Sequence, residues 1–558
     1  MLRLFITVFL TAILLLSGSA YALDAPSSSL AERVKEHTLD NGLRVVVVER
    51  HNAPVFFTLV AFRVGSTNEL PNHSGLSHFL EHMLGKGTKT IGTRNYKKEL
   101  PVMAQLETVA ARMRDLRLVL EDWRLEPFDA FATKVKAELP AEVRERIGAD
   151  EAAGWREVLR ALPEDHAELP EEWDNPPWML ADRDHDYWAV YRELLDCRAR
   201  LAGLIAQQRQ FIVQGELDGI YDVHGAKRHN AFTNQDMTGF TVGLPSNCLE
   251  LWMFLTADRF QNPVFREFYS ERKVVMEELR MYHNEPFFLL REALSSAAFR
   301  AHPYGRPIIG WMSDIKRTLR SEMEEHFRRY YVPNNCQIAV VGDVDAGEVF
   351  RLTERYFGSW RGHPVDNRVT VKEPEQKGER RVEVEYDAEP QLMIAFHAPV
   401  APNPDYYPLL IASLVLSSGR TSRFYRSIFV EQGLTVRAPW ASPPSGRYDD
   451  LFTVHAVPKA PHTTEEVEAA VLAELDRLKT EPPTQWEIEK VHNQFRVYQL
   501  GRLRSNEWLA YSLASYFSTR GDWRTIDEDI ARLLEAVSYT HLRAHETSLH
   551  LVCRLLLE

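Results

Sequence analysis

Short apolar runs bounded by turn residues mark the strands that the sequence predicts. Residues 42–49 (GLRVVVVE) and 55–64 (VFFTLVAFRV) are rich in β-branched and aromatic side chains, which is typical of buried strands. Residues 337–342 (QIAVVG) form a third run, and residues 382–386 and 392–397 repeat the pattern later in the chain. The runs therefore predict two separate groups of strands.

Helical periodicity appears between these strands. Residues 74–84 (SGLSHFLEHML) begin with Ser74 and then place apolar residues on a helical period, which predicts a helix start. Further helices are predicted near 248–260, 265–283, 405–416 and 463–479. Helices and strands in both groups predict an α+β protein. A length of 558 residues is too long for one core and agrees with two domains.

The two groups are unequal because a helical segment interrupts the first. From about 106 to 214 the chain reads as two long charged helices around an acidic, Trp- and Pro-containing segment at 163–179. This insertion is either a solvated spacer or a substrate lid. Residues 361–380 are polar, contain prolines and read as a linker. We therefore expect an N-terminal domain at 23–360 and a C-terminal domain at 381–536.

The two ends of the chain differ from the rest. Residues 1–22 combine Arg3, an apolar core and the small-residue pattern of Ala20 and Ala22, which predicts a signal peptide and a periplasmic or secreted protein. The alternative is an uncleaved membrane anchor. Residues 537–558 break the preceding pattern and resemble translated sequencing-adaptor read-through, so the C-terminal domain is expected to be truncated. The alternative is a genuine amphipathic tail.

Composition removes several classes of function. The net charge of -13 and the pI near 5.9 argue against a nucleic-acid partner, which usually meets a basic face. Four cysteines without a Cys-x-x-Cys pair indicate neither a thiolate zinc site nor a disulfide framework.

The strongest chemical signal is the sequence from His78 to His82, HFLEH. On a helix the two histidines lie on one face and can bind one metal ion. Zinc held by two histidines and a carboxylate keeps a fourth position for water, and Glu81 lies close enough to take a proton from that water. The alternative is a pair of surface histidines on an amphipathic helix. The apolar neighbours Phe79 and Leu80 argue against it, because they indicate a buried helix. Two histidines and a glutamate on a buried helix need a metal or hydrogen-bond partners.

Four segments around and beyond this motif follow one another along the chain: GSTNELPNHSGLSHFLEHMLGKGTKTIGT, NAFTNQDMTGF, FYSERKVVMEELRM and HPYGRPIIG. In sequence and in order they resemble the pitrilysin/insulinase-type zinc metallopeptidases. His-x-x-Glu-His is the motif order of the inverzincins. The resemblance implies two homologous α/β-sandwich domains of the metallopeptidase-like fold, the first enlarged by the helical insertion. It also implies half of a clamshell that encloses the substrate.

The resemblance also implies a third zinc ligand on the helix that contains VVMEEL. Glu278 takes the ligand position, whereas Glu277 points about 100° away on the helix. Glu271 resembles the family's carboxylate that orients a ligand histidine. The separation of His82 and Glu278 (278 − 82 = 196 residues) exceeds the family's usual spacing, and the insertion explains the excess.

Peptide binding is implied at a different segment. Asn230, Ala231, Phe232 and Thr233 resemble the family's substrate-facing edge strand, to which an extended peptide adds by main-chain hydrogen bonds. A plain edge strand would share this geometry.

In the C-terminal domain, Phe429 and Val436 stand where relatives often carry an Arg and a Tyr that contact substrate. We therefore expect a second peptidase-like subunit that supplies these contacts, or a homodimer.

Taken together, the sequence predicts a zinc-dependent endopeptidase with one zinc ion per chain and Glu81 as general base. A catalytically silent or partner-dependent assembly subunit is the first alternative. A metal-binding protein without hydrolytic activity is the second, and Glu81 argues against it because metal storage needs no general base.

Overall fold

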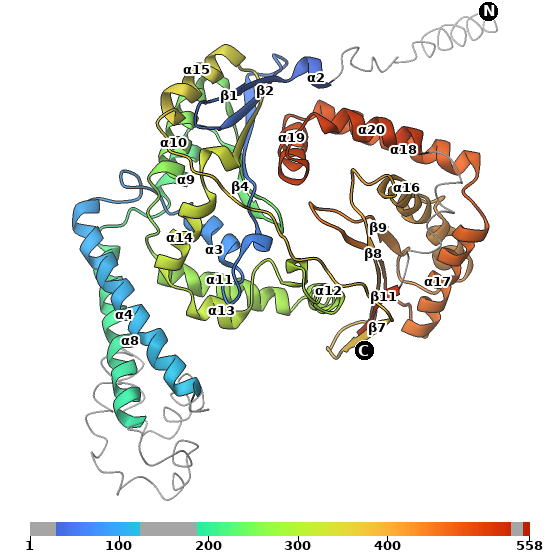
Figure 1. Cartoon of the computed structure of the whole chain (residues 1–558), viewed down its shortest axis with the longest axis horizontal. Coiled ribbons are helices and arrows are strands. Elements are labelled where there is room, and N and C mark those ends of the chain that lie inside the picture. Colours follow the sequence, from blue (N-terminus) through green and yellow to red (C-terminus); the bar gives the residue numbers. More distant parts are fainter. Residues whose placement is uncertain (1–29, 123–186, 537–550, 558) are drawn as a thin grey trace, which may run out of the picture.

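The computed structural model describes residues 30–122, 187–536 and 551–557, which form two halves with one sheet each (Figure 1). We call the described residues up to 360 the first half and those from 380 the second half. The strands of the first half are β1 (Lys35–Thr38), β2 (Arg44–Glu49), β3 (Val55–Phe62), β4 (Lys227–Thr233), β5 (Thr238–Pro245) and β6 (Cys336–Gly342). Those of the second half are β7 (Arg380–Val384), β8 (Gln391–Ala398), β9 (Trp440–Ser442), β10 (Asp450–Ala456) and β11 (Leu551–Leu557).

Apart from β1, the two sheets share one topology. Their strand orders are β1-β2-β6-β3-β5-β4 and β7-β11-β8-β10-β9. In the first sheet, β6 is parallel to β2 and antiparallel to β3, and in the second β11 is parallel to β7 and antiparallel to β8. The prediction of an α+β fold with two homologous sandwich domains is confirmed.

Helices cover both faces of each sheet. In the first half they are α2 (Leu30–Arg33), α3 (Leu76–Met83), α4 (Tyr96–Asp122), α8 (Tyr187–Arg209), α9 (Glu216–Val223), α10 (Leu249–Gln261), α11 (Phe268–His283), α12 (Pro286–Ala298), α13 (Met312–Arg317), α14 (Arg320–Tyr330) and α15 (Ala346–Phe357). In the second they are α16 (Tyr406–Ser417), α17 (Thr464–Thr480), α18 (Gln485–Arg504), α19 (Asn506–Arg520) and α20 (Thr525–Glu535), with a short π-helix at Tyr425–Glu431.

The strand β2 shows why its apolar run is continuous. Val45 and Val47 point into the core that contains α3 and α10, whereas Val46 and Val48 point into the core under α19. Successive side chains of a strand alternate between faces, so a strand with helices on both sides needs apolar residues at every position.

In each half, one helix packs against the sheet of the other half. The expected domain boundaries at 23–360 and 381–536 do not predict this packing. Leu290 and Leu294 of α12, a first-half helix, pack against Met393 of the second sheet. Conversely, Leu509 and Leu513 of α19 pack on the first sheet. Figure 1 shows α12 beside the second sheet and α19 between the halves. Each sheet is therefore closed on one face by a helix from the other half.

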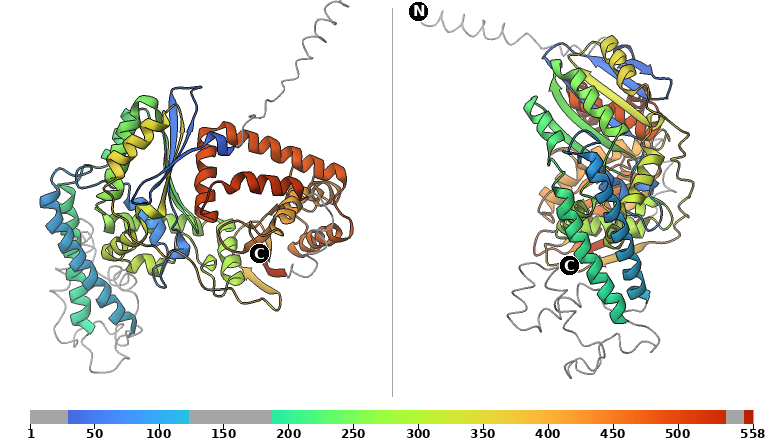
Figure 2. Two further views of the ribbon diagram at one scale, coloured as in Figure 1. Left: turned by 45° about the horizontal axis from the view of Figure 1, so that its top comes forward. Right: turned by 90° about the vertical axis from the view of Figure 1, so that its left-hand side faces the viewer.

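The predicted helical insertion projects from the first half. The helices α4 and α8 pack side by side and extend away from both sheets (Figures 1 and 2). The acidic segment at 163–179 and the predicted signal peptide at 1–22 lie outside the described residues. None of the helices in the described part of the chain has both the length and the apolar character that a membrane crossing requires.

The predicted linker and the predicted tail differ in secondary structure. Residues 361–378 contain no helix or strand, and Glu373 among them accepts hydrogen bonds from the backbone N–H groups of Arg300, Ala301 and His302. In the predicted non-native tail, residues 551–557 form β11 in the second sheet, while residues 537–550 and 558 lie outside the described part. The origin of the tail sequence stays a prediction.

Candidate metal and peptide site

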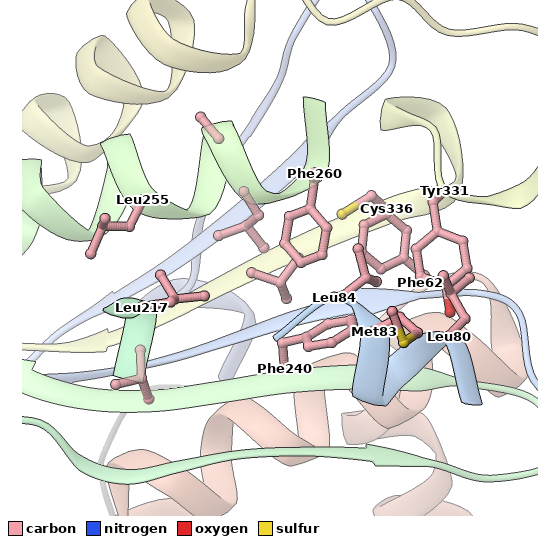
Figure 3. Packing of buried hydrophobic residues seen from close by; sticks show 14 of the residues in the cluster. Phe62, Leu80, Met83, Leu84, Leu217, Phe240, Leu255, Phe260, Tyr331 and Cys336 are labelled. Atoms are coloured by element: carbon pink, nitrogen blue, oxygen red, sulfur yellow. The ribbon is translucent and has the colours of Figure 1, made fainter. Parts of the chain in front are cut away.

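The helix α3 presents two different sides. Phe79, Leu80 and Met83 are buried, and Leu80 and Met83 pack with the aromatic core shown in Figure 3. His78 and His82 are only partly buried and lie on the other side. The apolar side fixes the helix in the core, and the histidines therefore have defined directions.

The start of α3 differs from the sequence-based prediction, because Ser74 does not cap the helix. Gly75, with φ of 84°, precedes its first turn, and the carboxylate of Glu69 accepts the N–H groups of Gly75 (2.8 Å) and Ser77 (2.7 Å). Ser74 instead donates its hydroxyl to Asp314 (2.6 Å). A buried carboxyl group, whose pKa burial raises to about 8, thus accepts two backbone N–H groups at this helix end.

A close backbone approach explains the glycine at this position. A Cβ atom on Gly75 would lie 2.1 Å from the carbonyl oxygen of Ile309, and one on Gly310 would lie 2.3 Å from that of Ser74. Both glycines also have positive φ, which other residues rarely adopt. The glycine pair therefore lets the loop 309–310 close against the head of the motif helix.

Three predicted ligands meet at one point. Nε2 of His78 lies 3.7 Å from Oε1 of Glu278, and Nε2 of His82 lies 3.3 Å from Oε2 of the same carboxylate. One ligand atom from each of the three residues can be chosen so that all lie within 4.8 Å of one another. Atoms that share a tetrahedral zinc ion at about 2.1 Å lie roughly 3.4 Å apart, so these separations suit one ion.

The protonation states of His78 and Glu278 suit a metal site. Burial and the charge of His82 lower the pKa of His78 to about 4, so its imidazole is neutral at pH 7, the form that binds metals. Its Nδ1 is buried and has no hydrogen-bond partner among the described residues. Hydrogen bonding from His82 lowers the pKa of Glu278 to about 2, so this carboxylate is ionised. Two nitrogens and a carboxylate oxygen are a zinc donor set.

The remaining carboxylates of α11, Glu271 and Glu277, have different surroundings. Oε1 of Glu271 lies 3.2 Å from Nδ1 of His82, and its Oε2 lies 2.6 Å from Nζ of Lys86. Burial opposes protonation of His82, but hydrogen bonds to Glu271 and Glu278 raise its pKa to about 9. Glu277 is exposed and pairs with Arg280, away from the histidines.

Glu81 is held by the predicted peptide-binding strand. The hydroxyl of Thr233, the last residue of β4, donates to Oε2 of Glu81 at 2.6 Å. Burial raises the pKa of the Glu81 carboxyl, and the Thr233 hydrogen bond opposes that rise. A carboxylate beside a donor set for zinc is placed to accept a proton from water and to return it.

A cavity of about 450 Å³ lies over this cluster. Asn230, Ala231, Phe232 and Thr233 line it, and β4 is the edge strand of its sheet. All the described residues that line it belong to the first half. Phe429 and Val436, the second-half positions that differ from the family pattern, are absent from its wall; Val436 is 57% exposed.

Two further side chains at the site were not predicted. Tyr282 donates its hydroxyl to Oε1 of Glu278 (2.9 Å), and Glu69 holds the head of α3. Tyr282 is four residues after Glu278 on one helix, so helical spacing could have revealed it. Nothing in the local sequence marks Glu69, because its partners are backbone amides.

Comparison with known families gives two matches. The family model "Insulinase (Peptidase family M16)" matches residues 44–106 and 214–311, and "Peptidase M16 inactive domain" matches residues 318–495. The first match is interrupted where α4 and α8 form the helical insertion.

Individual proteins agree with these matches. The zinc protease PqqE of Helicobacter pylori is 27% identical over 311 residues, which is 54% of this chain and 69% of that protein. The uncharacterized zinc protease YmxG of Bacillus subtilis is 22% identical over 306 residues, 54% of this chain and 74% of that protein.

Solved structures share the fold. A protease from Helicobacter pylori superposes with a TM-score of 0.67 at 21% identity, over 94% of this chain and 99% of that one. The periplasmic protease PqqL from Escherichia coli gives a TM-score of 0.62 at 15% identity, over 94% of this chain but only 48% of that one. The family models and these relatives agree with the motif order found in the sequence, and the chain belongs to the pitrilysin/insulinase family of zinc peptidases, family M16.

Proposed function

We propose that this chain is a zinc-dependent endopeptidase that cleaves peptides or unfolded polypeptide segments. One observation carries the proposal: His78, His82 and Glu278 converge on one point while Glu81 lies beside them, held by the edge strand. When bound, one zinc ion per chain supplies a Lewis acid that polarises the peptide carbonyl and makes water more acidic.

The roles of the side chains follow from their positions. His78, His82 and Glu278 would hold the ion, and Glu271 would orient His82 through Nδ1. Glu81 would take the proton of the attacking water and deliver it to the leaving amine. Thr233 would keep the Glu81 carboxylate pointed toward the cavity.

The substrate would bind as an additional strand. The free edge of β4 offers main-chain donors and acceptors at Asn230–Thr233, so an extended peptide would lie across the metal site. Main-chain pairing recognises extended conformation more than residue type, which favours peptides and unfolded segments over folded proteins.

The proposed quaternary arrangement is half of a clamshell. This chain matches 48% of PqqL, but 92% of the separately solved first half of PqqL. We propose that a second peptidase-like subunit, or a second copy of this chain, closes over the cavity. The predicted signal peptide and the periplasmic neighbour support export.

A silent or partner-dependent assembly subunit is the second candidate. It is favoured by the "inactive domain" match and by the lack of any second-half residue among the described residues that line the cavity. A subunit without catalytic activity does not need a complete site. The presence of all four residues therefore argues for an active peptidase: His78, Glu81, His82 and Glu278.

The deciding experiment compares the zinc-loaded chain with Glu81→Gln. Both proteins should contain one zinc ion by elemental analysis, because Glu81 is not a ligand. Cleavage of an unstructured peptide should fall by on the order of a hundredfold or more in the variant. Equal cleavage by both would refute the role of Glu81. Zinc binding without cleavage by the wild type would favour the second candidate.

A further inference from the structure

The helix α12 separates the cavity from the second sheet and has two distinct faces. Leu290, Leu294 and Ala298 are buried against the second half. The cavity face carries Phe288, Arg291, Glu292 and Ser295, at the i, i+3, i+4 and i+7 spacing of one helix side. A peptide on β4 would therefore have this face of α12 within reach.

A series of contacts connects Arg291 to the metal ligands. Its guanidinium lies over the ring of Phe288, 5.6 Å from the centroid. The Phe288 ring lies 4.7 Å from that of Tyr282, whose hydroxyl donates to Glu278. Arg291 is thus placed on the cavity wall beside the ligand helix, and not on a remote surface.

The other charged groups of this wall already have partners. Glu292 lies 3.6 Å from Nε2 of His283. Arg306 donates to the carbonyl oxygen of Glu69 at 3.2 Å. Arg291 is exposed and forms no ion pair with any of the described carboxylates.

Asp450, in the second half, lies close enough to Arg291 for the guanidinium charge to affect its pKa. Burial raises the pKa of Asp450 to about 6, and the charge of Arg291 is among those that oppose the rise. Asp450 nevertheless accepts the backbone N–H of Ser445 (3.2 Å) and makes no ion pair with Arg291. The guanidinium of Arg291 is therefore available to a carboxylate from outside the chain.

Guanidinium groups suit this task because they bind carboxylates through two parallel hydrogen bonds. In a peptide added to β4, alternate side chains point to opposite faces, so one side chain near the cleaved bond would point toward α12. A Glu or Asp at that position would reach an unpaired cation, whereas a Lys would meet a like charge.

We infer that Arg291 is a specificity-determining residue that favours substrates with an acidic side chain within about three residues of the cleaved bond. This inference rests on the proposed function, because it needs a peptide on β4. It adds a substrate class that main-chain pairing cannot provide.

The test uses peptides that differ only by Glu, Gln or Lys at each position near the cleaved bond. For the wild type, kcat/KM should be on the order of tenfold higher with Glu than with Gln at one position, and lowest with Lys. Arg291→Ala should remove the preference, and Arg291→Glu should reverse it in favour of Lys. Arg280→Glu, on the outward side of α11, is the matched control and should keep the wild-type order.

A binding measurement separates this inference from the proposed function. Fluorescence anisotropy of the same peptides with Glu81→Gln reports selection without cleavage. Cleavage without a charge preference, or a preference that persists in Arg291→Glu, would overturn only the inference. Preferential binding of acidic peptides that Arg291→Glu reverses, without cleavage by the wild type, would refute the enzyme but keep the role of Arg291 in peptide selection. Neither binding nor cleavage would overturn both.

Discussion

The two halves of this molecule have the same sheet topology but different chemistry at equivalent positions. The helix α3 follows β3 and packs beside β4, and α16 follows β8 and packs beside β9. The helix α3 carries His78, Glu81 and His82, whereas α16 reads YYPLLIASLVLS and contains no charged residue or histidine. One half therefore holds the polar site, and the equivalent helix of the other half carries no histidine or carboxylate that could build one.

The difference between the halves shows how the fold compensates for the free-energy cost of burying polar side chains at the site. Partly buried histidines and carboxylates give up hydration, and the structure must compensate with hydrogen bonds and packing elsewhere. The second half contributes by burying one face of α12 while the other face lines the cavity. The second half thus packs against the helix that lines this wall.

The largest expected effect separates two adjacent carboxylates on α11. Glu278→Ala should lower zinc affinity by at least roughly a hundredfold and abolish cleavage, because it removes a group that meets both histidines. Glu277→Ala should leave both properties unchanged, since this side chain is exposed and faces Arg280. Zinc titration and peptide cleavage measure the two effects. Equal losses in the two variants would contradict the assignment.

The next prediction tests whether the second half positions the site. Leu294→Ala on α12 should cost about 2–5 kcal/mol in the free energy of unfolding, because the side chain is fully buried. It should also lower kcat/KM in the folded protein, since α12 lines the cavity.

Leu416→Ala in α16 is the matched control for this cavity mutation. It should cost a similar free energy of unfolding but leave kcat/KM unchanged. Denaturant unfolding and kinetics well below the unfolding midpoint distinguish the two variants. If both lose activity equally, α12 has no special role.

Lowering the pH should reduce the free energy of unfolding by a smaller amount, through two buried histidines near the contact between α12 and the second sheet. Burial lowers the pKa of His302 and of His455 to about 4, and Arg437 assists at His455. As pH falls through 6.5, the unfolded chain takes up protons that the folded protein does not, so stability decreases until about pH 4.

Each of these histidines should contribute roughly 1–3 kcal/mol to that loss. Urea unfolding between pH 7 and pH 4.5 should show a shallower decline for His455→Gln than for the wild type. Parallel curves for the two proteins would exclude His455 as a source of the acid sensitivity.

The smallest predicted effect compares the two edge strands. Thr233→Val on β4 removes the hydrogen bond to Glu81 and should lower kcat roughly threefold to tenfold, with zinc content unchanged. Ser442→Ala on β9, the edge of the second sheet, should have no such effect. Steady-state kinetics of both variants provide the measurement, and an unchanged kcat in Thr233→Val would remove this residue from the site.

Local pattern was sufficient for much of this protein. Apolar runs predicted β2, β3, β6, β7 and β8, and helical periodicity predicted α10, α11, α16 and α17, because both signals arise from residues close in the chain. The i, i+4 spacing of His78 and His82 placed both on one helix face, and the choice of Glu278 over Glu277 agrees with the geometry.

The tertiary structure decided what depends on contacts between distant residues. The sequence by itself determined the two groups of elements, the motif helix and the inserted helices. It did not determine the packing of α12 and α19 against the sheet of the other half, the support of α3 by Glu69, or the position of Arg291 on the cavity wall. Each of these depends on which surfaces meet after folding, and hydrophobic burial is non-directional, so an apolar helix face does not specify the sheet that covers it.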